Sequence, residues 1–365
     1  MDNLRPMKAA LALARRGLGN VWPNPTVGCV LVKEGRVVGR GWTQPGGRPH
    51  GESEALARAG DEARGAIAYV SLEPCCHWGK TPPCTDALVA AGVSRVVVPI
   101  EDPDPRVSGQ GIERLRDAGI EVVTGVLAAE AAEINAGFFQ RLRQGRPLVT
   151  VKLATTLDGR IATHDGESRW ITGDVARDRG HLLRATHDAV MVGSNTVLID
   201  DPQLTCRLPG LGARSPVRIV VDGHLGTPLT ARLVAEASLV PTWFITLADG
   251  DAARRDALRG CGVELIDAPA TTDHTVDLVA ALQLLGERGL TRVLVEGGAG
   301  LVAALLRARL VDRLAWFHAP AIIGGDGIAA VAPLALRALA AAPRFERMSV
   351  EAVGEDVLET LRIKS

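Results

Sequence analysis

Along the first 145 residues, apolar positions alternate between helical spacing and the short runs of strands. Apolar side chains three or four residues apart indicate an amphipathic helix, whereas short apolar runs bounded by Gly and Pro are typical of strands. The predicted strands are residues 27–33, 36–42, 66–72, 95–100 and 121–126. The predicted helices are residues 4–14, 52–59, 85–91, 111–118 and 128–143. This alternation predicts an α/β domain.

The same alternation starts again after Gly145-Arg146-Pro147, which is the best boundary signal in the chain. The predicted strands of this half are residues 149–154, 189–193, 218–222, 242–247, 292–295, 316–323 and 358–363. Its predicted helices are residues 175–185, 278–288 and 301–307. We therefore predict an α/β protein of two domains, residues 1–146 and residues 147–365.

The composition excludes two classes of partner. The 365 residues carry a formal net charge of -1 without any run of Lys or Arg, so the footprint of a nucleic-acid-binding protein is missing. No apolar stretch reaches the roughly 18 uncharged residues of a membrane span. The N-terminus resembles an amphipathic helix and lacks the layout of a signal peptide. We therefore expect a cytoplasmic protein that binds neither nucleic acid nor a membrane, and whose six Cys form no disulfide framework.

The strongest chemical signal is a set of metal ligands in the first domain. His50 stands two residues before Glu52, and Cys75 and Cys84 follow. One imidazole and two thiols leave the fourth position of a zinc ion open, as in catalytic sites. The order H-x-E, then P-C and a second Cys, is the signature of zinc deaminases, whose Glu transfers protons and binds no metal. We predict His50, Cys75 and Cys84 as ligands and Glu52 as the catalytic acid–base group.

Two alternatives to this ligand set stay open. Cys76 competes with Cys75, which we prefer because it directly follows Glu73-Pro74. His77 as a fourth ligand would make the zinc site structural. Lys80 lies between the two thiol ligands, and this position favours a contact with phosphate.

Three loops carry further polar candidates. Asn24 stands between two prolines, which hold it either in a plain turn or as an amide presented to a ligand. Asp102 follows a predicted strand, where α/β proteins place ligand loops, although it can also serve only to cap the loop. The turn of residues 297–300 precedes a predicted helix, and its N–H groups can hold phosphate. This turn alone is weak evidence.

Both halves then match the motifs of a known family. His50-x-Glu52, Leu72-Glu73-Pro74-Cys75 and the run of residues 79–84 resemble the pyrimidine deaminase of riboflavin biosynthesis. The Thr-Pro-Pro-Cys insert separates this deaminase from cytidine and tRNA-adenosine deaminases. The second half is similar to the matching reductase, in residues 152–160, 168–172, 192–202 and 296–298. The whole chain resembles the bifunctional diaminohydroxyphosphoribosylaminopyrimidine deaminase and 5-amino-6-(5-phosphoribosylamino)uracil reductase family.

The resemblance implies a fold and two reactions. The fold is a cytidine-deaminase-like three-layer α/β/α domain followed by a dihydrofolate-reductase-like α/β domain. The first reaction removes a ring amino group of a pyrimidinone ribotide with zinc, and the second reduces the ribosyl group to ribityl with NADPH. The implied partners are small phosphorylated pyrimidines, and we expect a homo-oligomer.

The resemblance also assigns residues by motif position. The substrate contacts of the first domain would be Asn24, His77, Lys80 and Asp102. Those of the second domain would be Ser168, Arg184, Leu204, Arg207 and Glu296. NADPH would be held by Ala154, Trp170, Thr172, Thr196, Asp200, Gly297, Gly298 and Gly300. Lys152 is either a charge at a strand end or, as we expect, the group that polarises the sugar. Arg184 and Arg207 suit phosphate as bidentate donors, although a single Arg can also be only an exposed charge.

The sequence departs from the family pattern at several positions. Gly51 replaces a usual Ala, and Cys76 stands where Ser is common. Asp104 replaces a usual Asn, so we leave it out of the substrate contacts. Gly223 stands where Ser is common near the cofactor. If that Ser contacts the 2′-phosphate, Gly223 weakens the preference for NADP.

Two other functions compete with this assignment. A nucleic-acid or nucleoside deaminase with a separate C-terminal domain would share the zinc signature, but the neutral charge argues against it. A zinc module that binds a nucleotide without turnover is the second alternative.

Overall fold

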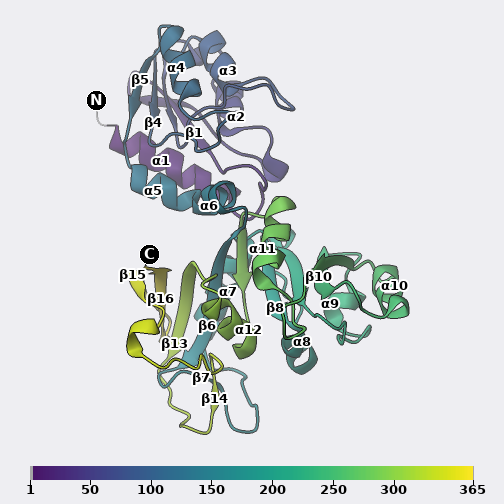
Figure 1. The fold of residues 1–365 in the computed structure, drawn as a ribbon. Helices are drawn as coiled ribbons and strands as arrows, with labels where there is room; N and C mark the ends of the chain where they lie inside the picture. Colours follow the sequence, from purple (N-terminus) through teal and green to yellow (C-terminus); the bar gives the residue numbers. More distant parts are fainter. Residues whose placement is uncertain (1–2, 365) are drawn as a thin grey trace. The chain divides into compact units, whose positions relative to one another are not determined.

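The computed structural model describes residues 3–364 and separates into two compact units, Met1–Gly145 and Arg146–Ser365 (Figure 1). Among the described residues, no helix is both long and apolar enough to cross a membrane.

The first unit is built on a five-stranded sheet with the order β2-β1-β3-β4-β5. Its strands are β1 (Gly28–Lys33), β2 (Arg36–Trp42), β3 (Ile67–Val70), β4 (Arg95–Val98) and β5 (Glu121–Thr124). β1 pairs antiparallel with β2 and β3, whereas β3, β4 and β5 are parallel. The hairpin between β1 and β2 turns at Glu34 and Gly35, whose φ angles of 52° and 78° suit a two-residue hairpin turn.

Helices cover both faces of this sheet (Figure 1). They are α1 (Leu4–Ala14), α2 (Gly51–Ala59), α3 (Cys84–Ala91), α4 (Gln110–Asp117), α5 (Ala128–Ile134) and α6 (Ala136–Gln144). On one face, α1 and α5 bury Met7, Leu11 and Ile134 against the strands. On the other face, α2, α3, α4 and α6 share a core that includes Leu88 and Leu115. The expected three-layer α/β/α architecture is confirmed.

One predicted helix, residues 128–143, is interrupted at Asn135. Its buried side chain accepts the N–H of Thr26 at 2.9 Å and donates to the carbonyl oxygen of Thr26 at 3.0 Å. Asn135 itself has φ -97° and ψ 14°, so the chain changes direction between α5 and α6. The apolar spacing carried no sign of this break because its cause is a residue 109 positions away.

The second unit is built on a nine-stranded sheet with the order β11-β10-β9-β8-β12-β6-β13-β16-β15. Its strands are β6 (Leu148–Thr156), β8 (Ala189–Gly193), β9 (Val217–Val221), β10 (Thr242–Leu247), β11 (Glu264–Ala268), β12 (Arg292–Val295), β13 (Arg313–Ala319), β15 (Phe345–Val353) and β16 (Asp356–Ile363). The strands from β11 to β13 are parallel, and β16 and β15 add to the β13 edge in antiparallel pairing. β7 (Arg160–Ala162) and β14 (Ile328–Ala329) form a separate small ribbon.

The helices of this unit are α7 (Asp174–Ala185), α8 (Ser194–Asp200), α9 (Arg232–Ala235), α10 (Ala252–Gly260), α11 (Leu278–Glu287) and α12 (Ala299–Arg307). α9 and α10 pack on β8, β9 and β10 through Leu233, Phe244 and Leu258. α7 packs on β13 and β16 through Ala176 and Phe317. The unit is an α/β fold, as expected.

The parallel register brings two charged side chains together. Val295, the last residue of β12, pairs with Val151 of β6. The next residues, Lys152 and Glu296, therefore stand beside each other. Glu296 directly follows the carboxyl end of β12, where open α/β sheets place their ligands, and Lys152 lies within β6. Both side chains line one cavity with α7.

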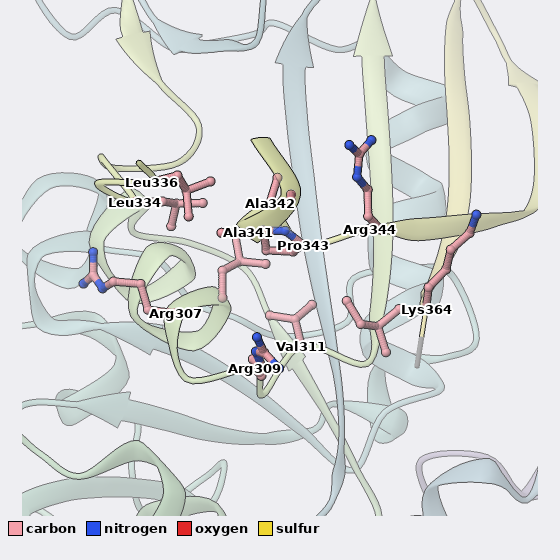
Figure 2. A pocket seen from close by; sticks show the side chains of 13 residues that line it. Arg307, Arg309, Val311, Leu334, Leu336, Ala341, Ala342, Pro343, Arg344 and Lys364 are labelled. Carbon is pink, nitrogen blue, oxygen red and sulfur yellow. The ribbon is translucent and has the colours of Figure 1, made fainter. Parts of the chain in front are cut away.

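A different hollow of about 550 Å³ lies where β13 begins and β16 ends (Figure 2). Nine of its lining residues are apolar, and the other four are Arg307, Arg309, Arg344 and Lys364. It contains none of the predicted site residues, and it lies toward the opposite end of β13 from the cavity of Lys152 and Glu296. We therefore assign the predicted chemistry to the other end of the sheet.

A buried ion pair ties the start of the second unit to its sheet. The guanidinium of Arg146 donates two hydrogen bonds, of 2.7 and 2.9 Å, to the carboxylate of Asp312, which also accepts the N–H of Val149 at 2.8 Å. The side chains of Arg146 and Asp312 are only 10% and 13% exposed. Asp312 thus neutralises a buried cation and satisfies a backbone donor at the first residues of β6.

We expect Asp312→Ala to lower the free energy of unfolding by about 3–5 kcal/mol, because it leaves the Arg146 charge buried without its partner. Urea unfolding of the full chain, followed through the transition of the second unit, measures the change. The control is Glu346→Ala, whose ion pair with Arg362 has side chains 42% and 47% exposed and should contribute only about 0–1 kcal/mol. Equal effects of the two substitutions would contradict this account.

Candidate active sites

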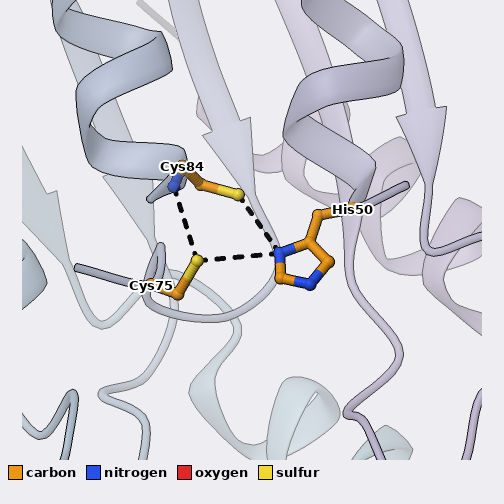
Figure 3. Close-up of side chains that lie close together, drawn as sticks. All are labelled: His50, Cys75 and Cys84. Atoms are coloured by element: carbon orange, nitrogen blue, oxygen red, sulfur yellow. Dashed lines mark hydrogen bonds between the residues drawn. The ribbon is translucent and has the colours of Figure 1, made fainter. Parts of the chain in front are cut away.

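His50, Cys75 and Cys84 converge in the first unit (Figure 3). His50 immediately precedes α2, Cys84 is the first residue of α3, and Cys75 lies in the loop after β3. The Nδ1 atom of His50 is 3.3 Å from the Sγ of Cys84 and 3.6 Å from the Sγ of Cys75. Ordinary zinc–nitrogen and zinc–sulfur bond lengths at a tetrahedral angle give a separation of about 3.6 Å. The donor set and its spacing fit a zinc ion.

The structure separates Cys75 from its competitor. Cys76 directs its Sγ toward the carbonyl oxygen of Arg106 at 3.6 Å, away from the other ligand atoms. His77 also lies outside the only His, Cys, Asp or Glu group of this kind among residues 3–364. The geometry therefore supports three protein ligands and an open fourth position, as in catalytic zinc sites.

Glu52 lies in the first turn of α2 and is 3% exposed. Its Oε2 atom is buried without a hydrogen-bond partner, although buried carboxylates are normally paired. Burial raises the pKa of Glu52 to about 7, against the opposing charge of His50. A carboxyl group with such a pKa can both accept and release a proton near neutral pH.

The predicted substrate contacts of this unit differ in exposure. Asp102 is buried, and burial raises its pKa to about 7. The Nδ1 atom of His77 is buried and lacks a partner, whereas Lys80 is exposed on the insert between the two Cys ligands. The amide of Asn24 donates to the carbonyl oxygen of Gly47 at 3.0 Å, so part of this side chain already holds the loop before His50.

In the sequence Glu73 is only one residue of a family motif, and the structure gives it a larger role. Its buried carboxylate accepts four backbone N–H groups, at 2.9–3.2 Å, from Asp102, Gly109, Gly111 and Ile112. Cys75 is two residues after Glu73 in the sequence. The Glu73 side chain therefore fixes the backbone at Asp102 relative to this zinc ligand. Its place directly before Pro74-Cys75 was the only signal in the sequence.

Asp104, which stands where the family has Asn, has its carboxylate occupied by an ion pair. Its carboxylate pairs with Arg106 through Nη2 at 2.5 Å and Nε at 2.9 Å. Hydrogen bonding from Arg106 lowers the pKa of Asp104. Leaving Asp104 out of the substrate contacts agrees with this arrangement.

In the second unit, predicted residues meet in two hollows that share Trp170, Arg184 and Arg207. The first, about 460 Å³, is lined among others by Lys152, Trp170, Thr172, Arg184, Arg207 and Glu296. The second, about 450 Å³, is lined among others by Ser168, Trp170, Arg184, Asp200, Leu204 and Arg207. Ala154, Thr196, Gly297, Gly298 and Gly300 line neither hollow.

Thr196 nevertheless lies against the turn after β12. A Cβ atom added to Gly297 or Gly298 would stand 3.3 or 3.4 Å from the Oγ1 of Thr196. Both glycines have positive φ, 155° and 80°, which other residues rarely adopt. The start of α8 and the turn before α12 therefore lie in contact. Thr196 and the two glycines could contact one cofactor only if they are close together, as they are here. Ala154 lies on β6 two residues after Lys152.

The first hollow contains a hydrogen-bonded ion pair with a lysine nearby. Arg184 holds Glu296 with two hydrogen bonds, Nε to Oε1 at 2.5 Å and Nη2 to Oε2 at 2.9 Å. Burial opposes the ionisation of Glu296, but Arg184 and then Lys152 outweigh it and lower its pKa. Burial lowers the pKa of Lys152, with Glu296 opposing that shift. Arg184 was expected to bind phosphate, and two of its nitrogens are already directed to Glu296.

His181 of α7 also lines the first hollow and was missed by the sequence analysis. Its Nδ1 accepts the backbone N–H of Arg207 at 3.4 Å. A single His in a helix with an ordinary amphipathic pattern gave no sign of this contact.

Family comparisons match the two units separately. Residues 2–100 match the zinc-binding region of cytidine and deoxycytidylate deaminases, and residues 147–358 match the RibD C-terminal domain. The class is therefore a two-part enzyme, a zinc-type deaminase joined to a reductase. The alternative of a nucleic-acid or nucleoside deaminase with a separate C-terminal domain is wrong because the relatives that match both units, over 96% of the chain, are riboflavin biosynthesis proteins.

Full-length relatives make the assignment specific. Riboflavin biosynthesis protein RibD of Aquifex aeolicus is 42% identical over 352 residues, which cover 96% of each chain. The RibD protein of Escherichia coli is 42% identical over 362 residues, also 96% of each chain. The structure of Acinetobacter baumannii RibD superposes with a TM-score of 0.87 at 37% identity, covering 99% of this chain and 98% of that one.

A Thermotoga maritima structure, described as a diaminohydroxyphosphoribosylaminopyrimidine deaminase and 5-amino-6-(5-phosphoribosylamino)uracil reductase, has a TM-score of 0.85 at 36% identity and covers 98% of both chains. The chain belongs to the RibD family, the bifunctional deaminase and reductase enzymes of riboflavin biosynthesis. It is therefore a hydrolase and an oxidoreductase in one polypeptide.

The ligand geometry predicts opposite results for two neighbouring thiols. Cys75→Ser should remove most of the bound zinc, because it deletes one of three protein ligands. Cys76→Ser should retain about one zinc ion per chain, because this thiol lies outside the cluster. Elemental analysis of the purified proteins measures both. Zinc loss in the Cys76 variant with zinc retained in the Cys75 variant would reverse the ligand assignment.

Proposed function

We propose that the first unit hydrolyses the ring amino group of 2,5-diamino-6-ribosylamino-4(3H)-pyrimidinone 5′-phosphate. We further propose that the second unit then reduces the ribosyl group of 5-amino-6-(5-phosphoribosylamino)uracil to ribityl with NADPH. The observation that carries the first step is the unpartnered carboxylate oxygen of Glu52 beside the His50, Cys75 and Cys84 cluster. The second step rests on Lys152 and Glu296, which meet in one cavity with Arg184.

In the deaminase unit, His50, Cys75 and Cys84 would hold one catalytic zinc ion. Bound zinc supplies a Lewis acid that lowers the pKa of water. Glu52 takes the proton of the attacking water and delivers it to the departing amine, a transfer that its pKa of about 7 suits. Asp102, His77, Asn24 and Lys80 are proposed to orient the pyrimidine ribotide, since His77 offers a buried nitrogen without a partner.

In the reductase unit, NADPH supplies the hydride. We assign its binding to Ala154, Trp170, Thr172, Thr196, Asp200, Gly297, Gly298 and Gly300. Lys152 polarises the sugar at the carbon that is reduced, and its lowered pKa makes proton donation easier. Glu296 holds Lys152 in place by charge. Ser168, Leu204 and Arg207 would receive the phosphorylated sugar, and Arg207 forms no hydrogen bond or ion pair through its side chain within residues 3–364.

A preference for NADPH over NADH is also proposed. An acid at a strand end can select NAD by binding the ribose 2′-hydroxyl. Asp222, which follows β9, uses its carboxylate to accept the N–H of Gly226 at 3.0 Å and the N–H of Thr227 at 2.8 Å. It is therefore occupied within its own turn. Gly223 supplies no side chain in place of the Ser common in the family, so the proposed preference rests on Asp222 and not on a contact at position 223.

We also propose a homo-oligomer, as expected from the sequence, and a cytoplasmic location, which agrees with six free Cys.

Glu52→Gln should reduce ammonia release by about 100-fold or more, because the amide cannot take the water proton. Bound zinc and NADPH oxidation on the preformed uracil ribotide should stay unchanged. Glu54→Gln, on the same helix, is the control and should retain deamination. Deamination that survives in the Glu52 variant would remove the proton-transfer role.

Lys152→Ala should give the converse result. Reduction of the uracil ribotide, followed as NADPH oxidation, should fall by about 100-fold or more through loss of the group that polarises the sugar. Ammonia release from the pyrimidinone ribotide by the same preparation should match that of the wild type. Unchanged reductase turnover would count against the assignment of Lys152.

A further inference from the structure

The segment of residues 204–207 carries two of the proposed ribotide contacts, Leu204 and Arg207, and α7 holds its backbone at two points. Arg184 donates from Nη1 to the carbonyl oxygen of Thr205 at 2.9 Å. His181 accepts the N–H of Arg207 on Nδ1 at 3.4 Å. Residues three apart lie on one face of a helix, so both side chains reach the segment from the same surface of α7.

Arg184 and His181 contact different parts of the segment. Arg184 also binds Glu296 through Nε and Nη2, so one guanidinium connects the end of β12 with Thr205. Arg207 keeps its guanidinium free of hydrogen bonds and ion pairs within the described chain, and only its backbone is held. The imidazole of His181 therefore fixes the backbone position from which the side chain of Arg207 extends.

Gln203, which directly precedes this segment, is also held by hydrogen bonds. Arg218, which is fully buried, donates to the carbonyl oxygen of Gln203 at 3.4 Å and pairs with Glu236 at 3.3 Å. The side chain of Gln203 donates to Glu236 at 3.3 Å. With one end fixed by β9 and α9, the position of residues 205–207 depends on the contacts from α7 and on Ser215, whose Oγ accepts the N–H of Cys206 at 3.1 Å.

We propose that His181 is a positioning residue of the reductase site, which fixes the backbone at Arg207 so that this cation receives the phosphate of the ribotide. The inference rests on the reductase function proposed above. His181 acts on substrate affinity and not on hydride transfer, because its contact is to the segment and not to Lys152.

The contact requires the neutral imidazole. Nδ1 accepts a hydrogen bond, so the ring proton belongs on Nε2, and a second proton would place two donors face to face. Burial and the charges of Arg184 and Arg207 lower the pKa of His181 below its usual 6.5, against Glu296 and the Thr205 carbonyl oxygen. The other charged groups of the cavity are Lys152 of β6 and, on α7, Asp174, Arg177 and Asp178. The hydrogen bond from the N–H of Arg207 to His181 is therefore fully formed above pH 6.5, and it is lost as the pH falls through the lowered pKa of His181.

Two substitutions separate a positioning role from a general structural one. His181→Leu removes the acceptor, whereas His181→Asn places a carbonyl oxygen near the position of Nδ1. Loss of one hydrogen bond predicts that the Leu variant raises KM for the uracil ribotide by about three- to tenfold. Its kcat and its KM for NADPH should stay within about twofold, and the Asn variant should recover most of the loss.

The pH profile supplies an independent readout. The ratio of KM in the wild type to KM in the Asn variant should rise as the pH falls below 6.5, since only the wild type gains a proton at position 181. Titration of the substrate phosphate affects both proteins and cancels in the ratio. Unchanged KM in the Leu variant, an Asn variant no better than Leu, or a flat ratio would each overturn the proposal.

The same proteins distinguish this inference from the proposed function. If the wild type forms no ribityl product, the reductase proposal fails. Calorimetric titration with ribose 5-phosphate then still decides the role of His181. Affinity that is weaker in the Leu variant and restored in the Asn variant supports the positioning role, and equal affinity in all three proteins overturns it.

Discussion

Charge buried at the carboxyl ends of parallel strands is the constraint on which both units depend. In the deaminase unit, Glu73 is 3% exposed and its carboxylate accepts four backbone N–H groups. In the reductase unit, Arg184 and Glu296 neutralise each other with two hydrogen bonds. Burying a charge without such partners costs several kcal/mol, on the order of the whole margin of stability of a domain. These contacts therefore hold loops that little else fixes.

The groups proposed to act on the substrate differ from these structural charges because they lack hydrogen-bond partners in the protein. The Oε2 atom of Glu52 and the Nδ1 atom of His77 are buried without partners, next to residues whose polar atoms are satisfied. An unpaired buried polar group costs free energy, so its presence in a folded site indicates a partner that arrives with the substrate or the metal. The free guanidinium of Arg207 is the corresponding group of the reductase unit, although it is exposed. Charged groups with hydrogen-bond partners in the protein therefore hold each site together, and groups without such partners are available to the substrate or the metal.

Short-range patterns in the sequence predicted much of this arrangement. His50, Glu52, Cys75 and Cys84 were found because zinc chemistry requires those residue types, and α3 begins at Cys84, one residue before the predicted start. The α/β alternation predicted most strands of both sheets, including β6 and β12, which place Lys152 and Glu296. Family motifs supplied the residues around Trp170, which the structure gathers into two neighbouring hollows.

Features that depend on distant partners were not predictable in this way. The break at Asn135 needs Thr26, and the roles of Glu73 and His181 need loops that no local pattern brings to them. Strand β15 was missed because most of its residues are partly or fully exposed, so it lacks a buried apolar run. Strand β13 was predicted at residues 316–323 but spans Arg313–Ala319, since apolar residues continue past its end into a loop. Apolar spacing records burial, and it does not record which polar atoms meet.

The central claim is that one chain performs deamination and then reduction on the same phosphorylated pyrimidine. The most direct measurement incubates the zinc-loaded protein with the pyrimidinone ribotide, with and without NADPH, and follows ammonia and product mass. The account predicts ammonia and an intact ribosyl product without NADPH, and the ribityl product only when NADPH is added. Reduction of the sugar without prior release of ammonia, or the absence of ammonia in both reactions, would contradict it.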